Sequence, residues 1–255
     1  MRNLERPGRS PVHAPTGMAS TSHTLSTQTA VQILQAGGNA MDAAIAACAV
    51  QCVVEPGSTG IGGDNFCLYA PAGSADITAF NGSGKAPSGA TVDYYQKLGI
   101  TKIQRDVHAV TVPGAVDAWW QLHQKFGHMP WADLLAPAIG YARDGYPISS
   151  RVHRDFAVEK ALLAAEPSMA ETFLVNGDVP AVGSRHSQPK LAKTLQLIAD
   201  HGRDAFYTGE VAEDIVTYLQ SKGGLHTMED FASVKGDFVT PISTDFRGHK
   251  VWECP

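Results

Sequence analysis

Two glycine-containing segments hold the residues of this sequence that are best suited to contacting a substrate. The first segment, residues 57–64, reads GSTGIGGD and ends in Gly63 and Asp64. Its glycines either let chain segments pack closely or turn backbone N–H groups toward a pocket, and both interpretations stay open. A nucleotide-binding loop would lie between a strand and a helix, whereas this loop follows a helical pattern and precedes a strand-like one. Nucleotide binding is therefore not favoured.

The second segment, residues 81–87, reads NGSGKAP and follows a strand-like run. Its polar side chains, Asn81, Ser83 and Lys85, are suited to the rim of an active site, where they would hold polar or charged groups of a substrate. An ordinary exposed turn has the same composition. The residue types alone leave both interpretations open.

Histidines and cysteines do not form a recognisable catalytic or metal-binding pattern. The sequence contains ten histidines but neither an H-E-x-x-H motif nor a G-x-S-x-G motif. We expect His123 and His128, near the end of a helix, to be surface residues. Cys48 and Cys52 lie one helical turn apart on an apolar helix, which is typical of buried small side chains and not of a zinc site. We expect no metal and no cofactor.

Composition limits the classes of partner. The 255 residues are 44% hydrophobic and 18% charged, with 20 Lys+Arg against 25 Asp+Glu. Disorder is not expected at this apolar content and small net charge of −5. There is no basic excess for nucleic acid and no run of about 18 apolar residues for a membrane span. The expected partners therefore include neither nucleic acid nor a membrane.

Apolar periodicity and turn residues predict the elements that position these segments. Helix patterns end at Gly37-Gly38 and at Gly223-Gly224, and Asn39 and Thr227 are suited to cap helices. The predicted helices cover 25–34, 40–53, 92–98, 113–126, 130–144 (kinked or split at Pro137), 150–165, 189–201 and 210–222, with a short one after Thr227. The predicted strands cover 65–70, 76–80, 108–112, 238–242 and 249–252. The irregular alternation favours an α+β fold or a layered αββα arrangement over a doubly wound sheet.

The ends of the sequence suggest one domain with an added arm. Residues 1–16 are rich in Arg and Pro and predict a flexible N-terminal arm, followed by one domain over 17–255. The arm lacks the apolar segment of a secretory signal, so the predicted location is the cytoplasm, or the periplasm if the N-terminus is misassigned. Residues 238–255 read as strand, turn and strand without a polar tail. We expect the domain to be truncated at its C-terminus.

Read in order, many short segments resemble the gamma-glutamyltransferase (gamma-glutamyltranspeptidase) family of the N-terminal-nucleophile (Ntn) hydrolases. The resemblance runs from Gly17 to Pro255 and depends on the number of segments that match in the same order. These segments are 17–20 with His23, 33–44, 54–56, 60–63 with Phe66, 112–114, 126–127, 130–131, 134–139, Ala142, 145–146, 206–210, 223–224, 229–230 and 246–248.

The resemblance implies an αββα sandwich formed by a proenzyme longer than this chain, of which the chain is the large-subunit part. In the family, the precursor cleaves itself before a threonine, which then attacks a gamma-glutamyl amide and forms an acyl-enzyme. The acyl group passes to water, an amino acid or a peptide. No threonine of this chain is assigned that role, because the motif is expected beyond Pro255. The implied partners are a small-molecule amide and the small subunit from the same precursor.

The sequence departs from the family at two positions that bear on substrate recognition. The family usually has Asp-Gly-Arg-Glu-Thr-Ala-Pro where this chain has residues 81–87, so Ser83 stands in place of the arginine that binds the substrate's α-carboxylate. Lys85 could supply the charge without the bidentate geometry of guanidinium. Asp64 stands where the glutamyltransferases tend to have glycine. The predicted substrate-binding residues are Asn81, Ser83, Lys85, Gly63 and Asp64.

Three functions are therefore compared. The first is gamma-glutamyl amide or glutathione cleavage and transfer. The second is a related amidohydrolase or acylase, similar to oxamate amidohydrolase or cephalosporin acylase, with other substrates. The third is a non-catalytic binding paralogue. If the chain forms half a sandwich, its sheet should also expose apolar side chains.

Overall fold

Two packed layers, an antiparallel sheet and a group of helices, organise the residues that the structure describes. The computed structural model describes residues 11–74 and 76–255. Of the predicted arm over 1–16, residues 1–10 lie outside the described residues, and residues 11–16 are exposed without helix or strand. The sheet has the strand order β1-β2-β5, formed by β1 (Asn65–Tyr69), β2 (Thr78–Gly82) and β5 (Asp237–Val239). The α+β class is confirmed.

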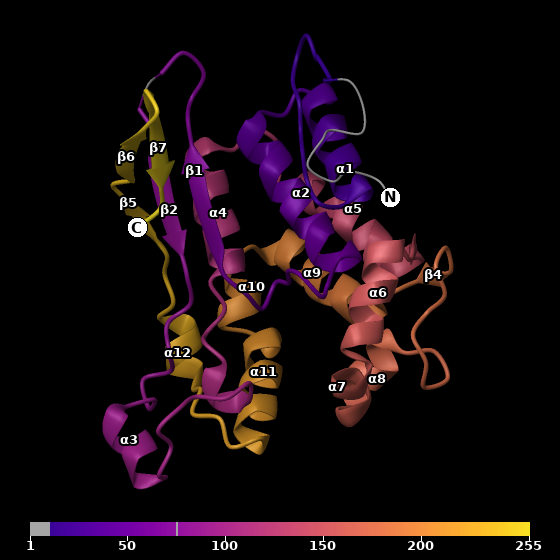
Figure 1. Ribbon diagram of the computed structural model, residues 1–255, viewed down its shortest axis with the longest axis vertical. Helices are drawn as coiled ribbons and strands as arrows, with labels where there is room; N and C mark the ends of the chain where they lie inside the picture. The colour runs from indigo at the N-terminus through magenta and orange to yellow at the C-terminus, as the bar shows by residue number, and fades with distance from the viewer. Residues whose placement is uncertain (1–10, 75) are drawn as a thin grey trace.

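Helix α2 (Ala40–Val54) lies at the centre of the helical layer because it is apolar almost all round. Asn39 caps it in a full capping box with Asp42, as the sequence predicts in part. Helix α1 (Thr24–Gln35) and α5 (Trp131–Asp144) pack against it, and α9 (Pro189–His201) packs on α5. Helix α4 (Ala115–Phe126) connects this group to β1 and β2. Figure 1 shows α4 behind the strands, with α1 and α2 beside them.

The remaining helices lie in the lower half of the molecule as viewed in Figure 1. They are α3 (Val92–Lys97), the 3-10 helix η1 (Val107–Ala109), α6 (Ser150–Val158), α7 (Lys160–Ala165), α8 (Pro167–Phe173), α10 (Asp204–Tyr207), α11 (Glu210–Ser221) and α12 (Met228–Ala232). Two short strands, β3 (Tyr146–Pro147) and β4 (Arg185–His186), pair with each other. The predicted cap at Thr227 is present as a capping box with Asp230.

One face of the sheet is covered and the other is open. Phe80 on β2 is fully buried and belongs to the core on the α4 side. The register pairs Phe66 with Asn81 and Leu68 with Ala79, which places Phe66 and Leu68 on the opposite face. Their exposed fractions are 55% and 44%. The predicted exposure of apolar sheet side chains is thus confirmed.

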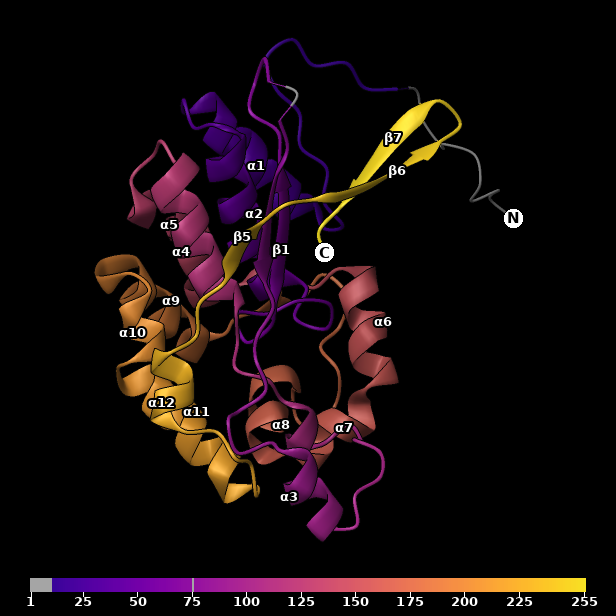
Figure 2. The same cartoon turned by 90° about the vertical axis from the view of Figure 1, so that its left-hand side faces the viewer.

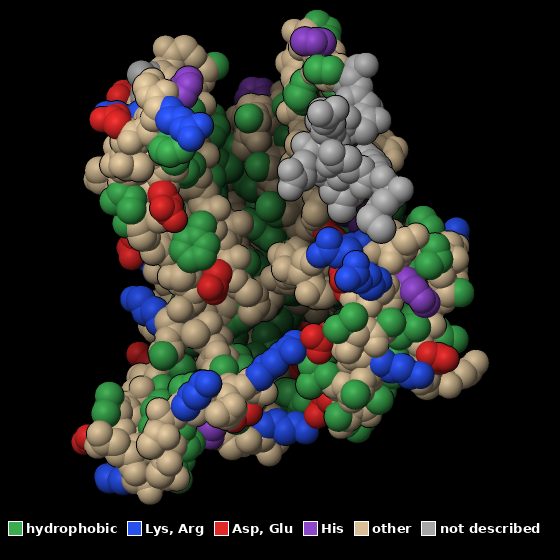
Figure 3. Space-filling model, viewed as in Figure 1, with side chains coloured by type: hydrophobic (Ala, Val, Ile, Leu, Met, Phe, Trp, Pro, Cys, Tyr) green, Lys and Arg blue, Asp and Glu red, His purple; other side chains and the backbone are tan. Residues whose placement is uncertain are grey.

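The last two strands leave the sheet. Strands β6 (Ile242–Phe246) and β7 (His249–Glu253) form a separate hairpin, which projects from the open side of the sheet in Figure 2. The space-filling view is hollowed between the strands and helices α1 and α2, and hydrophobic side chains line the hollow (Figure 3). Within the described residues, no helix is long and apolar enough to cross a membrane.

Several sequence predictions are corrected by the structure. The predicted strand over 108–112 is wrong: η1 covers its start, and Val112 bonds only to the carbonyl of Lys85, without a strand ladder. The single helix over 150–165 is two helices that meet at Glu159. Pro137 does not split α5, and α4 begins at Ala115 with Gly114 as its cap.

Candidate functional site

The glycine loop begins where Glu55 ends α2. The backbone carbonyl of Glu55 accepts hydrogen bonds from the N–H groups of Ser58 at 3.0 Å and Thr59 at 3.3 Å. Its buried carboxylate accepts the Ser22 hydroxyl at 2.5 Å and also bonds Gln51. The start of the loop is therefore fixed to α2 and to Ser22, just before α1, through one buried side chain.

The polar segment after β2 is organised by Asn81. Asn81 and Gly82 belong to β2, so the predicted turn starts two residues later than expected. The Asn81 side-chain carbonyl accepts the Ser83 N–H at 3.0 Å and the Ser83 hydroxyl at 2.7 Å. Asn side chains form such turns with the residue two positions on. The Ser83 hydroxyl therefore donates its hydrogen bond within the turn.

The loop and the turn meet at the start of α4. The Asp64 carboxylate accepts the Gly84 N–H at 3.1 Å. The Gly63 carbonyl accepts the N–H groups of Gly114 at 3.0 Å and Ala115 at 2.9 Å. The structure thus brings Gly63 and Asp64 to the turn that holds Ser83 and Lys85, as a common substrate-binding site would require. Their role in binding remains a prediction.

Close backbone approach explains two glycines at this junction. A Cβ atom at Gly84 would collide with the carbonyl oxygen of Val112, and one at Gly114 would collide with the carbonyl oxygen of Gly82. These two glycines lie outside the glycine loop of residues 57–64, within which an added Cβ would meet no atom closer than 3.4 Å. At Gly62 a Cβ would meet nothing within 4 Å, so packing gives no reason for glycine there.

Lys85 is the cation of this segment. Its side chain is exposed and takes part in none of the ion pairs found among the described residues. Ser83, at the position where the resemblance expects arginine, carries no charge. A substrate carboxylate at the turn would therefore meet an ammonium group, which acts as a point charge without a fixed fork.

The cysteines and histidines behave as structural residues. Burial raises the pKa of Cys52 to about 12 and that of Cys67 to about 11, so both stay thiols at neutral pH. Cys52 is buried as predicted, whereas Cys48, predicted to be buried with it, is only partly buried. His128 is exposed, whereas His123 is half-buried and bonds the Met129 carbonyl at 2.8 Å, so its prediction as a surface residue is wrong. No group of three or more metal-ligating side chains occurs within residues 11–74 and 76–255.

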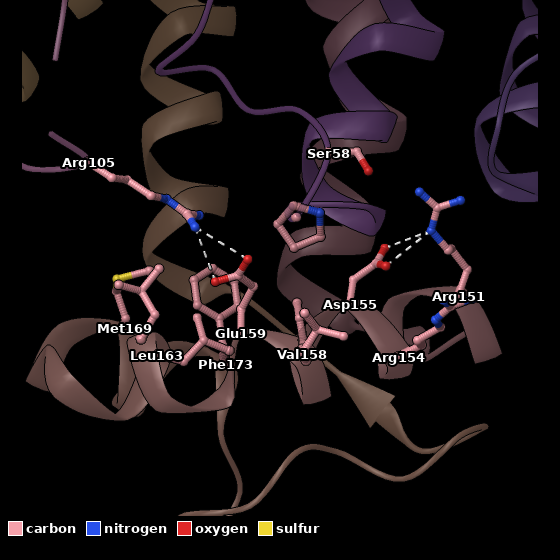
Figure 4. Close-up of a pocket in the computed structure, with 14 residues that line it drawn as sticks. Ser58, Arg105, Arg151, Arg154, Asp155, Val158, Glu159, Leu163, Met169 and Phe173 are labelled. Atoms are coloured by element: carbon pink, nitrogen blue, oxygen red, sulfur yellow. Dashed lines mark hydrogen bonds and ion pairs between the residues drawn. The ribbon is translucent and has the colours of Figure 1, made fainter. Parts of the chain in front are cut away.

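Two further features were not singled out in the sequence. Asp117 on α4 is buried and bonds Arg203 at 2.5 Å, Gln121 at 2.7 Å and the Gly236 N–H at 2.8 Å. The bonds to Arg203 and Gly236 join α4 to the start of α10 and to the chain between α12 and β5. The second feature is a cavity of about 490 Å³ beside α6, which contains none of the predicted site residues (Figure 4). In the sequence, the only local indication of this cavity is the pair Arg151 and Arg154, three residues apart on α6.

Comparison with known proteins gives consistent matches along the chain. A family model described as gamma-glutamyltranspeptidase matches residues 26–255. The glutathione hydrolase-like YwrD proenzyme of Bacillus subtilis is 39% identical over 93% of this chain and 45% of its own length. The oxamate amidohydrolase proenzyme of Klebsiella pneumoniae is 36% identical over 92% of this chain and 46% of its own. The chain spans less than half the length of these two relatives.

A solved structure shows the same fold. The gamma-glutamyltranspeptidase of Helicobacter pylori superposes with a TM-score of 0.90 at 31% identity, covering 96% of this chain and 72% of that one.

Proposed function

The chain belongs to the gamma-glutamyltranspeptidase family, and on that premise we propose that it is the N-terminal, large-subunit part of an autoprocessing amidohydrolase and acyltransferase. The related proteins from Bacillus subtilis and Klebsiella pneumoniae are named as proenzymes, which supports processing of a precursor. The nucleophilic threonine belongs, in this proposal, to the part of the relatives' length that this chain does not span.

The proposed reaction proceeds through an acyl-enzyme. The threonine hydroxyl adds to the amide carbonyl while its own α-amine takes up the hydroxyl proton. The tetrahedral oxyanion collapses, the C–N bond breaks, and the leaving amine departs with that proton. Water or an acceptor amine then adds to the ester and releases the acyl group. No cofactor is required by these steps.

This chain would contribute one wall of the substrate site. The contact between Asp64 and Gly84 holds the turn of residues 83–85 against the glycine loop, and this contact is the observation that carries the site assignment. Lys85 would pair with a carboxylate of the substrate, while Asn81 and Ser83 fix the shape of the turn. Gly63 would position the start of α4 behind the turn.

A second candidate substrate class follows from Ser83. Without a guanidinium at this position, the two-bond contact that arginine makes with a carboxylate cannot form. This favours an amide substrate other than a gamma-glutamyl peptide, handled by the same acyl-enzyme chemistry. The match to a protein named oxamate amidohydrolase supports the same alternative.

The open sheet face would be covered by the small subunit. Phe66 and Leu68 expose apolar side chains on this face, and the β6–β7 hairpin projects from the same side (Figure 2). Large exposed apolar patches on folded proteins commonly mark surfaces that bind a partner. A partner from the same precursor would bury them.

A substrate panel on the full-length, processed protein tests the proposal. The panel contains gamma-glutamyl-p-nitroanilide, glutathione and oxamate, each assayed with the wild-type protein and with Ser83→Arg. If the missing guanidinium limits gamma-glutamyl recognition, Ser83→Arg should raise kcat/KM for both gamma-glutamyl compounds by roughly 10-fold. This is the effect expected from one added charge-assisted contact. Efficient glutathione turnover by the wild type would reject the second candidate class. Turnover of no amide in the panel would count against the enzyme proposal.

A further inference from the structure

The cavity of about 490 Å³ beside α6 is separate from the proposed substrate site. Its walls come from α6, α7 and α8, from the start of the glycine loop, and from Arg105, which approaches from the chain before η1 (Figure 4). Gly63, Asp64 and the turn at 83–85 do not line it. Cavities of 300–1,000 Å³ are the usual size for organic ligands.

The lower part of the cavity is apolar. Leu163 is buried at its base, and Met169 and Phe173 of α8 lie beside it (Figure 4). Val158 and Leu162 line the same cavity but are 74% and 40% exposed. Such apolar side chains would be covered by an alkyl or aryl group that enters the cavity, with a gain of about 25 cal/mol per Å² removed from water.

The rim of the cavity carries guanidinium groups with unused donors. Arg105 uses one terminal nitrogen for both 3.3 Å bonds to Glu159. Arg151 uses only its Nε for Asp155, at 2.9 and 3.2 Å. Arg154 forms no side-chain hydrogen bond or ion pair among the described residues. An arginine has five N–H donors in a planar fork, so most donors of these three remain free for an anion.

The two acidic side chains at the rim do not cancel this charge. Three arginines against Asp155 and Glu159 leave an excess of one positive charge in the lining. The Arg105–Glu159 pair is solvent-exposed, with side chains 76% and 43% accessible. Exposed pairs contribute little to stability, so a ligand anion can compete for the guanidinium at small cost.

We propose that this cavity binds a small organic carboxylate that carries an alkyl or aryl group. The carboxylate lies at the arginine rim, in charge-assisted hydrogen bonds with Arg151 and Arg154, and the apolar group lies against Leu163, Met169 and Phe173. This site is additional to the proposed amide-cleaving function and does not depend on it. Binding is therefore measurable whether or not the protein cleaves any amide.

Isothermal titration calorimetry on the full-length protein tests the proposal with octanoate as the probe. Octan-1-ol has the same chain without the carboxylate, acetate has the carboxylate without the chain, and octyl phosphate replaces the carboxylate by another anion. We expect octanoate to bind at least about 10-fold more tightly than either octan-1-ol or acetate, since both halves of the site contribute. Equal binding of octanoate and octan-1-ol would overturn the proposal, and so would no octanoate binding or about 10-fold tighter binding of octyl phosphate.

Variants locate the bound probe. Arg151→Gln with Arg154→Gln should weaken octanoate binding by roughly 10-fold or more, the loss expected for charge-assisted bonds. Leu162→Glu, at a partly exposed position, should abolish binding by placing a carboxylate in the cavity. Arg143→Gln, in an exposed ion pair with Asp144 on α5, is the matched control and should bind as the wild type. Unchanged binding in both cavity variants would show that octanoate binds elsewhere, and would contradict the assignment.

Discussion

The carboxylate of Asp64 accepts a hydrogen bond from the backbone N–H of Gly84 at 3.1 Å. These two residues are 20 positions apart, and their contact joins the loop that leaves α2 to the turn that leaves β2. The turn contains Ser83 and Lys85, so the geometry of the proposed carboxylate-binding segment depends on a side chain from another element.

Replacing Asp64 should weaken substrate binding more than it weakens folding. Asp64→Ala removes the acceptor of the Gly84 N–H, which is exposed to water and can be rehydrated. We expect KM of the full-length enzyme to rise by about threefold, the effect of one exposed hydrogen bond, with Tm nearly unchanged. Asp214→Ala, at an exposed position of α11, is the matched control. An unchanged KM in Asp64→Ala would show that the contact between Asp64 and Gly84 does not contribute to substrate binding.

Lys85 should act through its charge. Lys85→Met is expected to raise KM for a carboxylate-bearing amide by about 10-fold, while Lys85→Arg keeps most of the affinity. Lys97→Met, which removes an exposed lysine of α3, should leave KM unchanged. Steady-state kinetics on one carboxylate-bearing amide and on its methyl ester isolate the effect of the charge. The KM for the ester should be the same in Lys85→Met as in the wild type. A similar loss with both substrates would argue against carboxylate binding by Lys85.

The buried pair of Asp117 and Arg203 should be a major determinant of stability. Their side chains are only 2% and 17% exposed, and Asp117 also holds Gln121 and the Gly236 N–H. Asp117→Ala removes the buried partner of a largely buried guanidinium, which keeps only its ion pair with the exposed carboxylate of Asp204. Breaking a buried pair typically costs about 3–5 kcal/mol in the free energy of unfolding. Urea denaturation measures this loss. Asp144→Ala, which breaks an exposed pair with Arg143, should change stability by less than about 1 kcal/mol.

Stability should fall as the pH drops below neutrality. Burial lowers the pKa of His186, which packs against Tyr146, Phe156 and Phe173. The unfolded chain then binds its proton at a higher pH than the folded chain does. The His186 contribution is therefore fully present above the ordinary pKa of about 6.5 and declines below it.

Denaturation at a series of pH values measures this slope, which approaches about 1.4 kcal/mol per pH unit for one proton. His186→Phe should reduce the slope between about pH 6.5 and 5. The remaining slope belongs to His23 and His226, which are also buried and whose pKa values burial also lowers. His128→Gln, at an exposed position, should keep the wild-type profile. A wild-type slope retained in His186→Phe would assign the pH dependence to other groups.

Local signals in the sequence were sufficient for most helices. Asn39 and Thr227 predict helix starts because capping depends on residues within three positions, and the structure has both caps. The strand predicted over 108–112 shows the limit of this reasoning. Its alternating residues suit a strand, but a strand also needs a neighbouring chain to bond with, and only the Lys85 carbonyl meets it at Val112.

The residues of the candidate site were chosen from the sequence, whereas their arrangement came from the structure. Two separate segments of the sequence contain these residues, Gly63 and Asp64 in one and Ser83 and Lys85 in the other. No local sequence pattern indicates that the two segments lie close together. Their contact arises because β1 and β2 pair antiparallel, with Asn65 opposite Gly82, so that the residues flanking these positions meet. Asp117 could not be predicted at all, because its partners Arg203 and Gly236 lie 86 and 119 residues away.

The most direct test of the account is the mass of the purified full-length protein under denaturing conditions, before and after incubation with an amide substrate. We predict two chains produced by one cleavage, the second beginning with threonine, and a covalent acyl adduct on that second chain after rapid quenching. A single uncleaved chain that nevertheless hydrolyses the amide, or an adduct on a residue of the segment described here, would contradict it.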